Sequence, residues 1–325
     1  MLDIVFMGTP DFAKESLEAI YNAGHNIIAV VTNPDRPKGR GMKMIASPVK
    51  EFAIEKSIPV LQPEKIREIK DTLEQINPDL FCVVAYGKIL PQDILDIPKK
   101  GSINVHGSLL PQYRGAAPIQ WAVLNGDKKT GITTMYMNAG MDTGDMILQE
   151  EVQIGEDETT GELWDRLSKI GAKLLVETVD KIEKGTAPRT PQSGEFTMAP
   201  MLNKEMARID WINKNSREIK NLVRGLNPIM GAYTTYNDKK IKIWRAGSIE
   251  LDEFIENHPE FADYKVSLNN MEGGAVIYSD IKQGLYVKAK TGIVIIQEVQ
   301  AENAKRMPVQ DFLRGNLIQT GEVFE

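Results

Sequence analysis

The chain has 325 residues, a formal net charge of −6, one cysteine and 42% hydrophobic residues. This length and composition are typical of a globular protein with room for two domains, and they exclude a small disulfide-stapled scaffold. The acidic balance argues against a protein that coats nucleic acid by bulk charge, although a local basic patch remains compatible with it. No apolar run reaches the roughly 20 residues of a membrane helix. Met1 leads directly into a strand-like stretch, so we expect no membrane segment and no leader.

The single cysteine and the histidines predict neither a disulfide nor a metal site. Cys82 lies in the apolar run of residues 80–85, which is typical of a buried small hydrophobic residue, and a chain without disulfides fits a reducing cytoplasm. His25, His106 and His258 are scattered and lack metal-ligand spacing. We therefore expect a cytoplasmic protein that holds no metal.

In the first half of the chain, short apolar runs alternate with amphipathic segments. The spacing predicts strands at residues 2–7, 27–32, 80–85 and 102–106, and helices at residues 12–22, 49–56 and 66–76. Several strands are almost continuously apolar, as in a parallel sheet that helices cover on both faces. The predicted fold class of this half is a doubly wound, Rossmann-like α/β domain.

The turn after the first strand places Gly8 and a helix N-terminus at the carboxyl end of the strand, where open α/β sheets bind ligands. The turn lacks the G-x-G-x-x-G pattern, so a dinucleotide site has little support. We expect Thr9 or Asp11 to cap the following helix, with a direct catalytic role as the alternative.

A basic loop at residues 33–44 follows the second predicted strand. Its cations are interrupted by glycine and proline, and they are Arg36, Lys38, Arg40 and Lys43. Charge runs are usually solvated loops, but the place of this one at the ligand-binding edge of the sheet favours a segment that binds phosphates.

Asn104 and His106 lie at the end of the fourth predicted strand. Because they are two residues apart, they face the same side of the strand. A carboxamide and a protonated imidazole are both hydrogen-bond donors, as a site for a developing oxyanion requires. From the spacing alone, this role and a purely structural one, in which both side chains satisfy loop backbone, remain open.

A second polar cluster contains Asp142 and Asp145 on either side of a Thr-Gly pair, between strand-like residues 132–137 and 146–149. The cluster has the composition of a hairpin loop. A carboxylate near His106 would keep the imidazole charged or relay a proton, but sequence spacing does not show that the two groups meet.

The remaining chain predicts a long helix, a linker and a second domain. Residues 160–184 keep helical apolar spacing, and a stretch rich in proline, glycine and small polar residues follows. We therefore expect a first domain at residues 1–188, a linker at 189–206 and a second domain at 207–325. The second domain reads as a helix at residues 216–224 and five short strands, which predict a small barrel, with an acidic insertion at 251–264.

Together these motifs resemble those of the methionyl-tRNA formyltransferases, and the likeness covers nearly the whole chain. The string Asn-x-His-x-Ser-Leu-Leu-Pro at residues 104–111, followed by Asp-Thr-Gly at residues 142–144, marks folate-dependent formyltransferases generally. The basic loop and the second domain, with Ala-Arg-Ile-Asp-Trp at 207–211 and Gly-Leu-Asn-Pro at 225–228, narrow the likeness to the tRNA enzymes.

The resemblance implies a role for each group of residues. It implies a catalytic set of Asn104, His106 and Asp142. The implied folate contacts are Tyr86, Gly87, Ser108, Leu109, Leu110 and Pro111. The implied tRNA contacts are Arg36, Lys38, Arg40 and Lys43, of which Arg40 matches the family's functionally important loop arginine.

The resemblance also implies the reaction and the partners. The co-substrate is expected to be 10-formyltetrahydrofolate and the acceptor initiator methionyl-tRNA, so that the product is N-formylmethionyl-tRNA for translation initiation. No metal is needed, because the folate carries an activated one-carbon group. The second domain is expected to be an oligonucleotide-binding (OB-like) barrel, and the chain a monomer. Further expected tRNA contacts are basic residues of that domain, namely Lys220, Arg224, Lys239, Lys240 and Lys242.

Two alternatives remain. Formyltransferases for amino sugars, and the hydrolase-type domain of formyltetrahydrofolate dehydrogenase, carry the same His-x-Ser-Leu-Leu-Pro string, and the basic loop argues against both. A non-enzymatic RNA-binding protein with an inert α/β domain would leave Asn104, His106 and Asp142 without a purpose.

Overall fold

The computed structural model describes residues 1–38 and 43–325, which form two compact units. The first unit contains Met1–Ile119, Lys129–Gln153 and Trp164–Pro200, and the second contains Gln120–Lys128, Ile154–Leu163 and Met201–Glu325. Two short segments from the first half of the chain therefore belong to the second unit, which the sequence analysis did not predict. No helix among the described residues combines the length and the apolar character that a membrane crossing requires.

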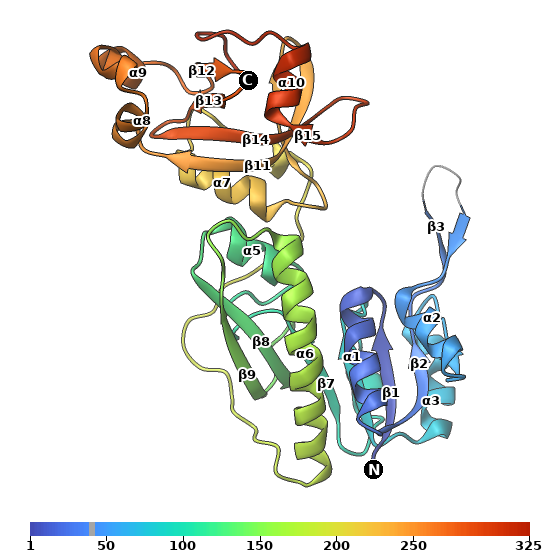
Figure 1. Cartoon of the computed structure of the whole chain (residues 1–325). Helices are drawn as coiled ribbons and strands as arrows, with labels where there is room; N and C mark the ends of the chain where they lie inside the picture. Colours follow the sequence, from blue (N-terminus) through green and yellow to red (C-terminus); the bar gives the residue numbers. More distant parts are fainter. Residues whose placement is uncertain (39–42) are drawn as a thin grey trace. The chain divides into compact units, whose positions relative to one another are not determined.

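A seven-stranded sheet forms the centre of the first unit (Figure 1). Its strands follow the order β5 (Val60–Leu61), β2 (Asn26–Val31), β1 (Asp3–Gly8), β6 (Leu80–Val84), β7 (Ser102–His106), β8 (Lys129–Tyr136) and β9 (Met146–Gln153). The first five strands in this order are parallel to one another. Strand β8 pairs antiparallel with β7, and β9 pairs antiparallel with β8. The prediction of a parallel sheet is thus corrected to a mixed one. The short loop between β8 and β9 closes a hairpin, because a parallel crossover needs about a dozen residues or more.

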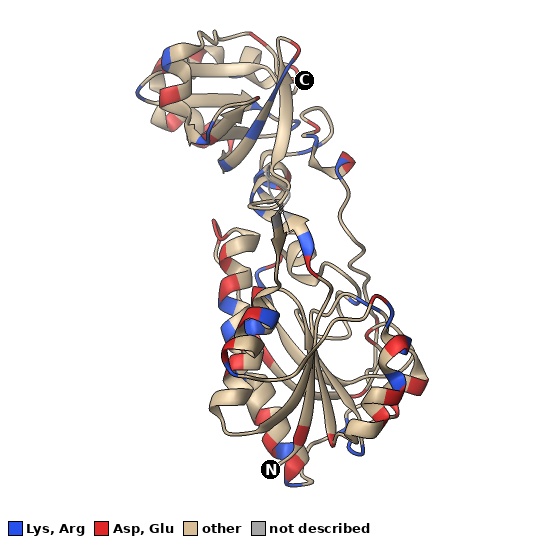
Figure 2. Ribbon diagram, turned by 90° about the vertical axis from the view of Figure 1, so that its right-hand side faces the viewer, with Lys and Arg blue, Asp and Glu red and all other residues tan. Residues whose placement is uncertain are grey.

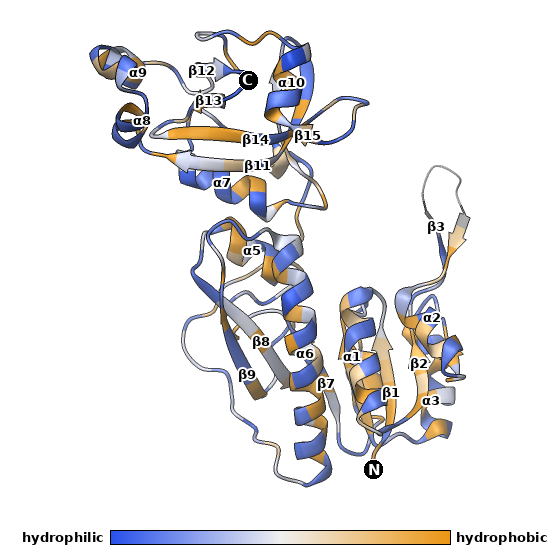
Figure 3. Ribbon diagram, viewed as in Figure 1, coloured by the Kyte–Doolittle hydropathy of each residue, from blue (hydrophilic) through white to orange (hydrophobic). Residues whose placement is uncertain are grey.

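Helices cover both faces of this sheet, as the apolar strands predicted. One face carries α1 (Asp11–Asn22), α2 (Pro48–Glu55) and α6 (Thr160–Glu183), and Phe12 of α1 packs edge-to-face on Trp164 of α6 at 5.1 Å between ring centroids. The other face carries α4 (Gln92–Leu95), α3 (Lys70–Ile76) and a 3-10 turn (Ile66–Ile69) that precedes α3. The inner strand β2 is largely hydrophobic, whereas the edge strand β9 mixes apolar and polar residues (Figure 3), as expected for covered and half-exposed strands.

The carboxyl ends of β1, β2 and β6 are joined by hydrogen bonds through Thr9 and Asn33. The Asn33 Nδ2 donates to Thr9 Oγ1 and to the Tyr86 carbonyl, both at 3.0 Å. Neither Thr9 nor Asp11 makes the predicted side-chain cap, because the N-cap residue of α1 is Pro10. Thr9 instead links neighbouring strand ends, so it shapes the edge of the sheet at which ligands bind in open α/β folds.

Six antiparallel strands form the sheet of the second unit. Their order is β10 (Ala232–Tyr236), β11 (Lys239–Ile249), β14 (Ile293–Ala301), β13 (Gly284–Lys288) and β12 (Val276–Asp280), with β15 (Met307–Pro308) also paired to β14. Helix α7 (Ser216–Gly225) begins at a capping box made by Asn215 and Glu218, and it shares one core with α10 (Val309–Gly315) through Val223 and Phe312. The five predicted strands are all present.

The acidic segment forms short helices inserted between β11 and β12. These are α8 (Leu251–Asn257), a 3-10 turn (Pro259–Tyr264) and α9 (Lys265–Asn269). Phe254 of α8 is fully buried with Ile277 and Ile293 in a small core of its own. Acidic and basic residues are interspersed over both units (Figure 2).

The segment predicted as a linker is only partly a linker. Residues up to Pro200 belong to the first unit. Thr190 and Met146 exchange two backbone hydrogen bonds at 2.9 and 3.0 Å. Ala199, which is fully buried, donates its N–H to the Arg114 carbonyl and accepts the Ala117 N–H at its own carbonyl. Proline, glycine and polar composition predicted an unattached segment. The backbone hydrogen bonds that attach it are independent of side-chain type, so composition does not reveal them.

Candidate functional site

His106 is the last residue of β7, and its side chain is 5% exposed. Its Nε2 lies 2.9 Å from the Tyr113 carbonyl oxygen. Because a carbonyl oxygen only accepts, Nε2 carries the proton of this bond. The other ring nitrogen, Nδ1, is not used in this bond and faces the other groups of the site.

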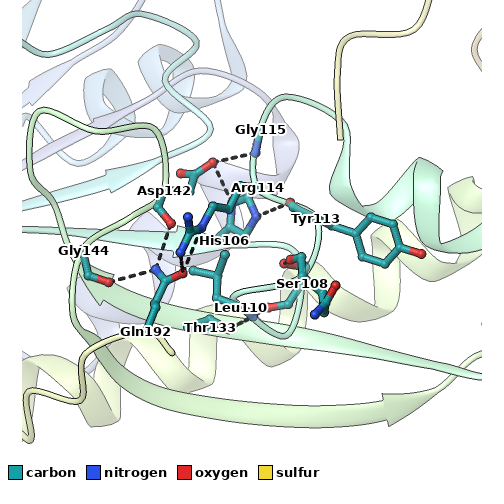
Figure 4. A network of polar contacts seen from close by, with 11 residues as sticks. His106, Ser108, Leu110, Tyr113, Arg114, Gly115, Thr133, Asp142, Gly144 and Gln192 are labelled. Carbon is teal, nitrogen blue, oxygen red and sulfur yellow. Dashed lines mark hydrogen bonds and ion pairs between the residues drawn. The ribbon is translucent and has the colours of Figure 1, made fainter. Parts of the chain in front are cut away.

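Asp142 lies in the loop between β8 and β9 and faces Nδ1 of His106 (Figure 4). One carboxylate oxygen, Oδ2, is 3.7 Å from Nδ1 and accepts the Gly115 N–H at 2.8 Å. The distance from Oδ2 to Nδ1 is within the range of an ion pair but is too long for a hydrogen bond. Nδ1 therefore remains available for a hydrogen bond with another group. Asp142 has a φ of 52°, in the left-handed region that non-glycine residues rarely adopt. Residues 36 apart in sequence thus meet, as the resemblance implied.

Asn104 lies two residues before His106 on the same side of β7, as the strand spacing predicted. It is half-buried, and in the described part of the chain its side chain has no hydrogen-bond partner. The amide N–H₂ is therefore available as a donor at the strand end that carries His106. The structure brings the predicted triplet of Asn104, His106 and Asp142 to one region of the first unit.

The predicted folate contacts after β6 differ in accessibility. The Tyr86 side chain is 2% exposed and packs in the core beside Val83 and Leu90, and this burial raises the pKa of Tyr86 to about 12. Such burial contradicts a direct side-chain contact from Tyr86 to a ligand. The neighbouring Ala85 and Gly87 are exposed, so the end of β6 offers mainly backbone to a ligand.

The predicted folate contacts after β7 form a turn held by its own hydrogen bonds. The Ser108 hydroxyl is fully buried and donates to the Gln112 carbonyl at 2.6 Å. Leu110 is buried, and its carbonyl accepts the Gln149 Nε2 at 2.9 Å. The side chains of Ser108 and Leu110 are therefore buried and shape the turn, and their predicted contact with folate stays a prediction. Leu109 and Pro111 are partly exposed.

The basic loop forms the hairpin of β3 (Arg36–Lys38) and β4 (Lys43–Ile45). Arg36 is exposed. Arg40 lies outside the described residues, as do the side chains of Lys38 and Lys43. The base of the hairpin is held by Asp35, whose carboxylate accepts Lys50 Nζ at 2.6 Å and Gln62 Nε2 at 2.8 Å. These hydrogen bonds hold the pKa of Asp35 below its usual range.

The basic residues predicted in the second domain divide into two groups. Lys220 and Arg224 are 8% and 7% exposed and bind the segment that follows β9. The Lys220 ammonium pairs with Asp157 at 2.7 Å, and Arg224 Nη1 donates to the carbonyls of Gly155 and Glu158. Their predicted contact with tRNA is therefore wrong, because their charges already serve the second unit itself.

The other basic residues lie on β11 and on the connection to β15. Lys239 and Lys240 are exposed, and the Lys240 ammonium lies 3.5 Å from the centroid of the Tyr233 ring. The exposed Arg306, which was not predicted, stacks on Trp244 at 3.3 Å. Lys242 lies 5.2 Å from the same ring and donates to the Met230 carbonyl; burial, with Lys240 and Arg306 nearby, lowers the pKa of Lys242.

One group of possible metal ligands occurs among the described residues, away from the predicted triplet. His25, Asp180 and Glu183 place one ligand atom each within 4.8 Å of one another. Asp180 Oδ1 lies 3.2 Å from His25 Nε2, and Glu183 pairs with the Met1 amino group. Asp180 and Glu183 therefore already have partners in this structure. The single thiol, Cys82, is fully buried, and burial raises its pKa, which agrees with its predicted role as a core residue.

Sequence reasoning missed three contacts of the site. They are the Tyr113 carbonyl on His106, the Gly115 N–H on Asp142, and the side chain of Gln192, which lies in the predicted linker. The first two are backbone groups and have no sequence signature. Gln192 carried no signal beyond its residue type in a polar segment.

Two family descriptions match the chain: "Formyl transferase" over residues 2–179 and "Formyl transferase, C-terminal domain" over residues 201–317. Similar curated proteins include the methionyl-tRNA formyltransferase of Clostridioides difficile, 50% identical over 326 residues with 99% of both chains covered. The methionyl-tRNA formyltransferase of Ruminiclostridium cellulolyticum is 47% identical over 324 residues, also with 99% of both chains covered.

Solved structures with a similar fold are more distant in sequence. An N-formyltransferase from Helicobacter canadensis, in complex with folinic acid and dTDP-3-aminofucose, has a TM-score of 0.64 at 19% identity, with 93% of this chain and 100% of that chain covered. HypX from Aquifex aeolicus, in complex with tetrahydrofolic acid, has a TM-score of 0.59 at 15% identity, with 96% of this chain but 47% of that longer chain covered. At these identities the likeness establishes the fold.

Proposed function

Because the chain belongs to the methionyl-tRNA formyltransferase family, we propose that it transfers the formyl group of 10-formyltetrahydrofolate to the α-amino group of methionine esterified to initiator tRNA. The observation that carries the proposal is the meeting of His106 and Asp142 beside the free amide of Asn104 at the carboxyl end of β7. The product, N-formylmethionyl-tRNA, is used for translation initiation, and we propose a cytoplasmic location for the protein. The resemblance further implies a monomer.

Two donors of this site stabilise the negative charge that the reaction creates. When the amine attacks the formyl carbon, the electron pair of the carbonyl bond moves onto its oxygen. The Asn104 amide donates to this oxygen, and protonated His106 donates from Nδ1, because its Nε2–H is committed to the Tyr113 carbonyl. The 3.7 Å separation between Nδ1 and Asp142 leaves room for that bond.

Asp142 supplies the negative charge and the proton acceptor. Its Oδ2 lies 3.7 Å from Nδ1 of His106, whereas its Oδ1 has no hydrogen-bond partner among the described residues. Oδ1 accepts the proton that the amine loses. A water carries this proton to the folate nitrogen that leaves with the electron pair of the broken C–N bond.

The proposed folate site is the edge of the first unit formed by the ends of β6 and β7. The exposed backbone at Ala85 and Gly87 and the partly exposed Leu109 and Pro111 surround the strand ends that carry Asn104 and His106. The bound co-substrate supplies an activated formyl group, so no metal is required.

The tRNA is proposed to contact basic surfaces on both units. On the first unit the surface is the β3–β4 hairpin, with Arg36, Lys38, Arg40 and Lys43. On the second unit it is the group Lys239, Lys240, Lys242 and Arg306. We assign the sheet of the second unit to an OB-like barrel, because such barrels combine cations with aromatic side chains, as Lys240 with Tyr233 and Arg306 with Trp244 do here.

Formylation of three acceptors tests the proposed function. The purified chain is incubated with 10-formyltetrahydrofolate and, separately, with methionyl initiator tRNA, methionyl elongator tRNA and an amino-sugar nucleotide. We expect rapid product only with the initiator tRNA. Product with the sugar nucleotide, or release of formate, would agree with the proposed formyl-transfer chemistry but would contradict the proposal that methionyl-tRNA is the acceptor.

Replacing Arg36 by alanine is expected to weaken tRNA binding and to leave the KM for folate unchanged. The exposed guanidinium would contact phosphates, whose neutralisation releases counterions, so the slope of log affinity against log salt should fall by about one. Binding of initiator tRNA is measured at several salt concentrations. Lys100→Ala, which removes an exposed charge at the opposite end of β7, is the matched control. An unchanged slope, or a raised KM for folate, contradicts the assignment.

A further inference from the structure

Gln192 lies beside the site and uses its whole side-chain amide in hydrogen bonds (Figure 4). Its Oε1 accepts Nε and Nη2 of Arg114 at 3.0 and 2.6 Å. Its Nε2 donates to the backbone carbonyls of Asp142 and Gly144 at 2.8 and 2.9 Å. Arginine only donates and carbonyls only accept, so the orientation of the amide is fixed.

These bonds join two loops that hold the catalytic groups. Arg114 lies between Tyr113, whose carbonyl accepts from His106, and Gly115, whose N–H donates to the Asp142 carboxylate. The other loop carries Asp142 itself. Gln192 therefore links the backbone of the Asp142 loop to the backbone of Tyr113–Gly115. This second segment forms hydrogen bonds with the side chains of both His106 and Asp142.

The backbone of Asp142 depends on external support. Its φ of 52° costs free energy relative to an ordinary conformation, and such conformations persist where the surroundings enforce them. The Gln192 Nε2 bonds the carbonyl of this very residue. The carboxylate, in turn, must remain close to Nδ1 of His106 while leaving space for the substrate oxygen.

From this geometry we infer that Gln192 is a positioning residue for formyl transfer, which acts by holding Asp142 in line with His106. The inference rests on the proposed function, since it needs Asp142 to act in the reaction. It also gives the segment after α6 a second role, because Gln192 reaches the site from the stretch that leads to the second unit.

Two substitutions separate the two halves of the contact. Gln192→Glu keeps a partner for Arg114 but places a carboxylate oxygen against the carbonyls of Asp142 and Gly144. Gln192→Ala removes both halves. We expect both variants to lower the single-turnover rate by about 10- to 100-fold with little change in KM for either substrate, because a displacement near 1 Å has effects of this size. Melting temperatures are measured alongside, and the glutamate variant, which retains the arginine contact, keeps the test valid if the alanine variant does not fold.

Gln112→Ala is the matched control. This amide bonds the same segment, through the Glu195 carbonyl at 2.9 Å, but does not contact Asp142 or Gly144. We expect its rate to be within about twofold of wild type.

A double substitution tests whether Gln192 acts through Asp142. If it does, adding Gln192→Glu to Asp142→Asn lowers the rate by no more than about twofold, because the group being positioned is already lost. A full multiplicative loss, or a wild-type rate for Gln192→Glu beside a slow Asp142→Asn, overturns this inference alone. A wild-type rate for Asp142→Asn overturns the proposed catalytic assignment and this inference together.

Discussion

Replacing His106 or Asn104 by alanine is expected to lower the rate of formyl transfer by about 100- to 1000-fold. Each substitution removes one donor to the oxyanion, and a lost donor of this kind typically costs about 2.7 to 4 kcal/mol in the transition state. Because the charge on the oxygen appears only during the reaction, the KM values should change much less than kcat. Single-turnover formylation of initiator methionyl-tRNA is the measurement.

Folate binding and the melting temperature serve as controls for the His106 and Asn104 variants. His106 is buried at a strand end, so a lower melting temperature for His106→Ala would be unsurprising, whereas the half-buried Asn104 has no partner among the described residues to lose. An Asn104→Ala variant with near-normal single-turnover rate would remove Asn104 from the catalytic set.

Asp142→Asn is expected to lower the rate by about 100-fold or more while leaving the loop intact. Asparagine tolerates the left-handed conformation of this position and keeps an oxygen for the Gly115 N–H. It removes, however, the negative charge that lies opposite Nδ1 of His106. The single-turnover rate and the affinity for tRNA are measured together.

The loss of rate in Asp142→Asn should not depend on tRNA affinity, because the residue is assigned no contact with tRNA. If the variant instead transferred the formyl group normally and bound tRNA poorly, Asp142 would be an acceptor-binding residue. The contrast between the two readouts separates proton chemistry from binding.

Local pattern predicted the parts of the fold and the site that depend on neighbouring residues. Apolar runs and helical spacing located the principal strands and helices of the first unit, and the two-residue spacing placed Asn104 and His106 on one side of β7. Strand alternation alone enforces that arrangement. The meeting of His106 with Asp142 was different, because only the resemblance, and no local rule, related residues so far apart.

The features that sequence reasoning missed depend on tertiary contacts. Lys220 and Arg224 look like free charges in a sequence, yet they lie one helical turn apart on the buried side of α7. The residues around Gln192 look like a linker, yet their backbone is bonded to the first unit. Neither burial nor backbone pairing can be read from residue type when the partner segment is far away in the chain.

The central claim is tested most directly by following a labelled formyl group through a single turnover. The chain, in excess over labelled 10-formyltetrahydrofolate, is mixed with initiator methionyl-tRNA and an amino-sugar nucleotide at equal concentration. We predict that the label appears on the α-amino group of the methionyl-tRNA, and that Asp142→Asn suppresses this transfer. Label recovered as formate or on the sugar nucleotide would contradict the account.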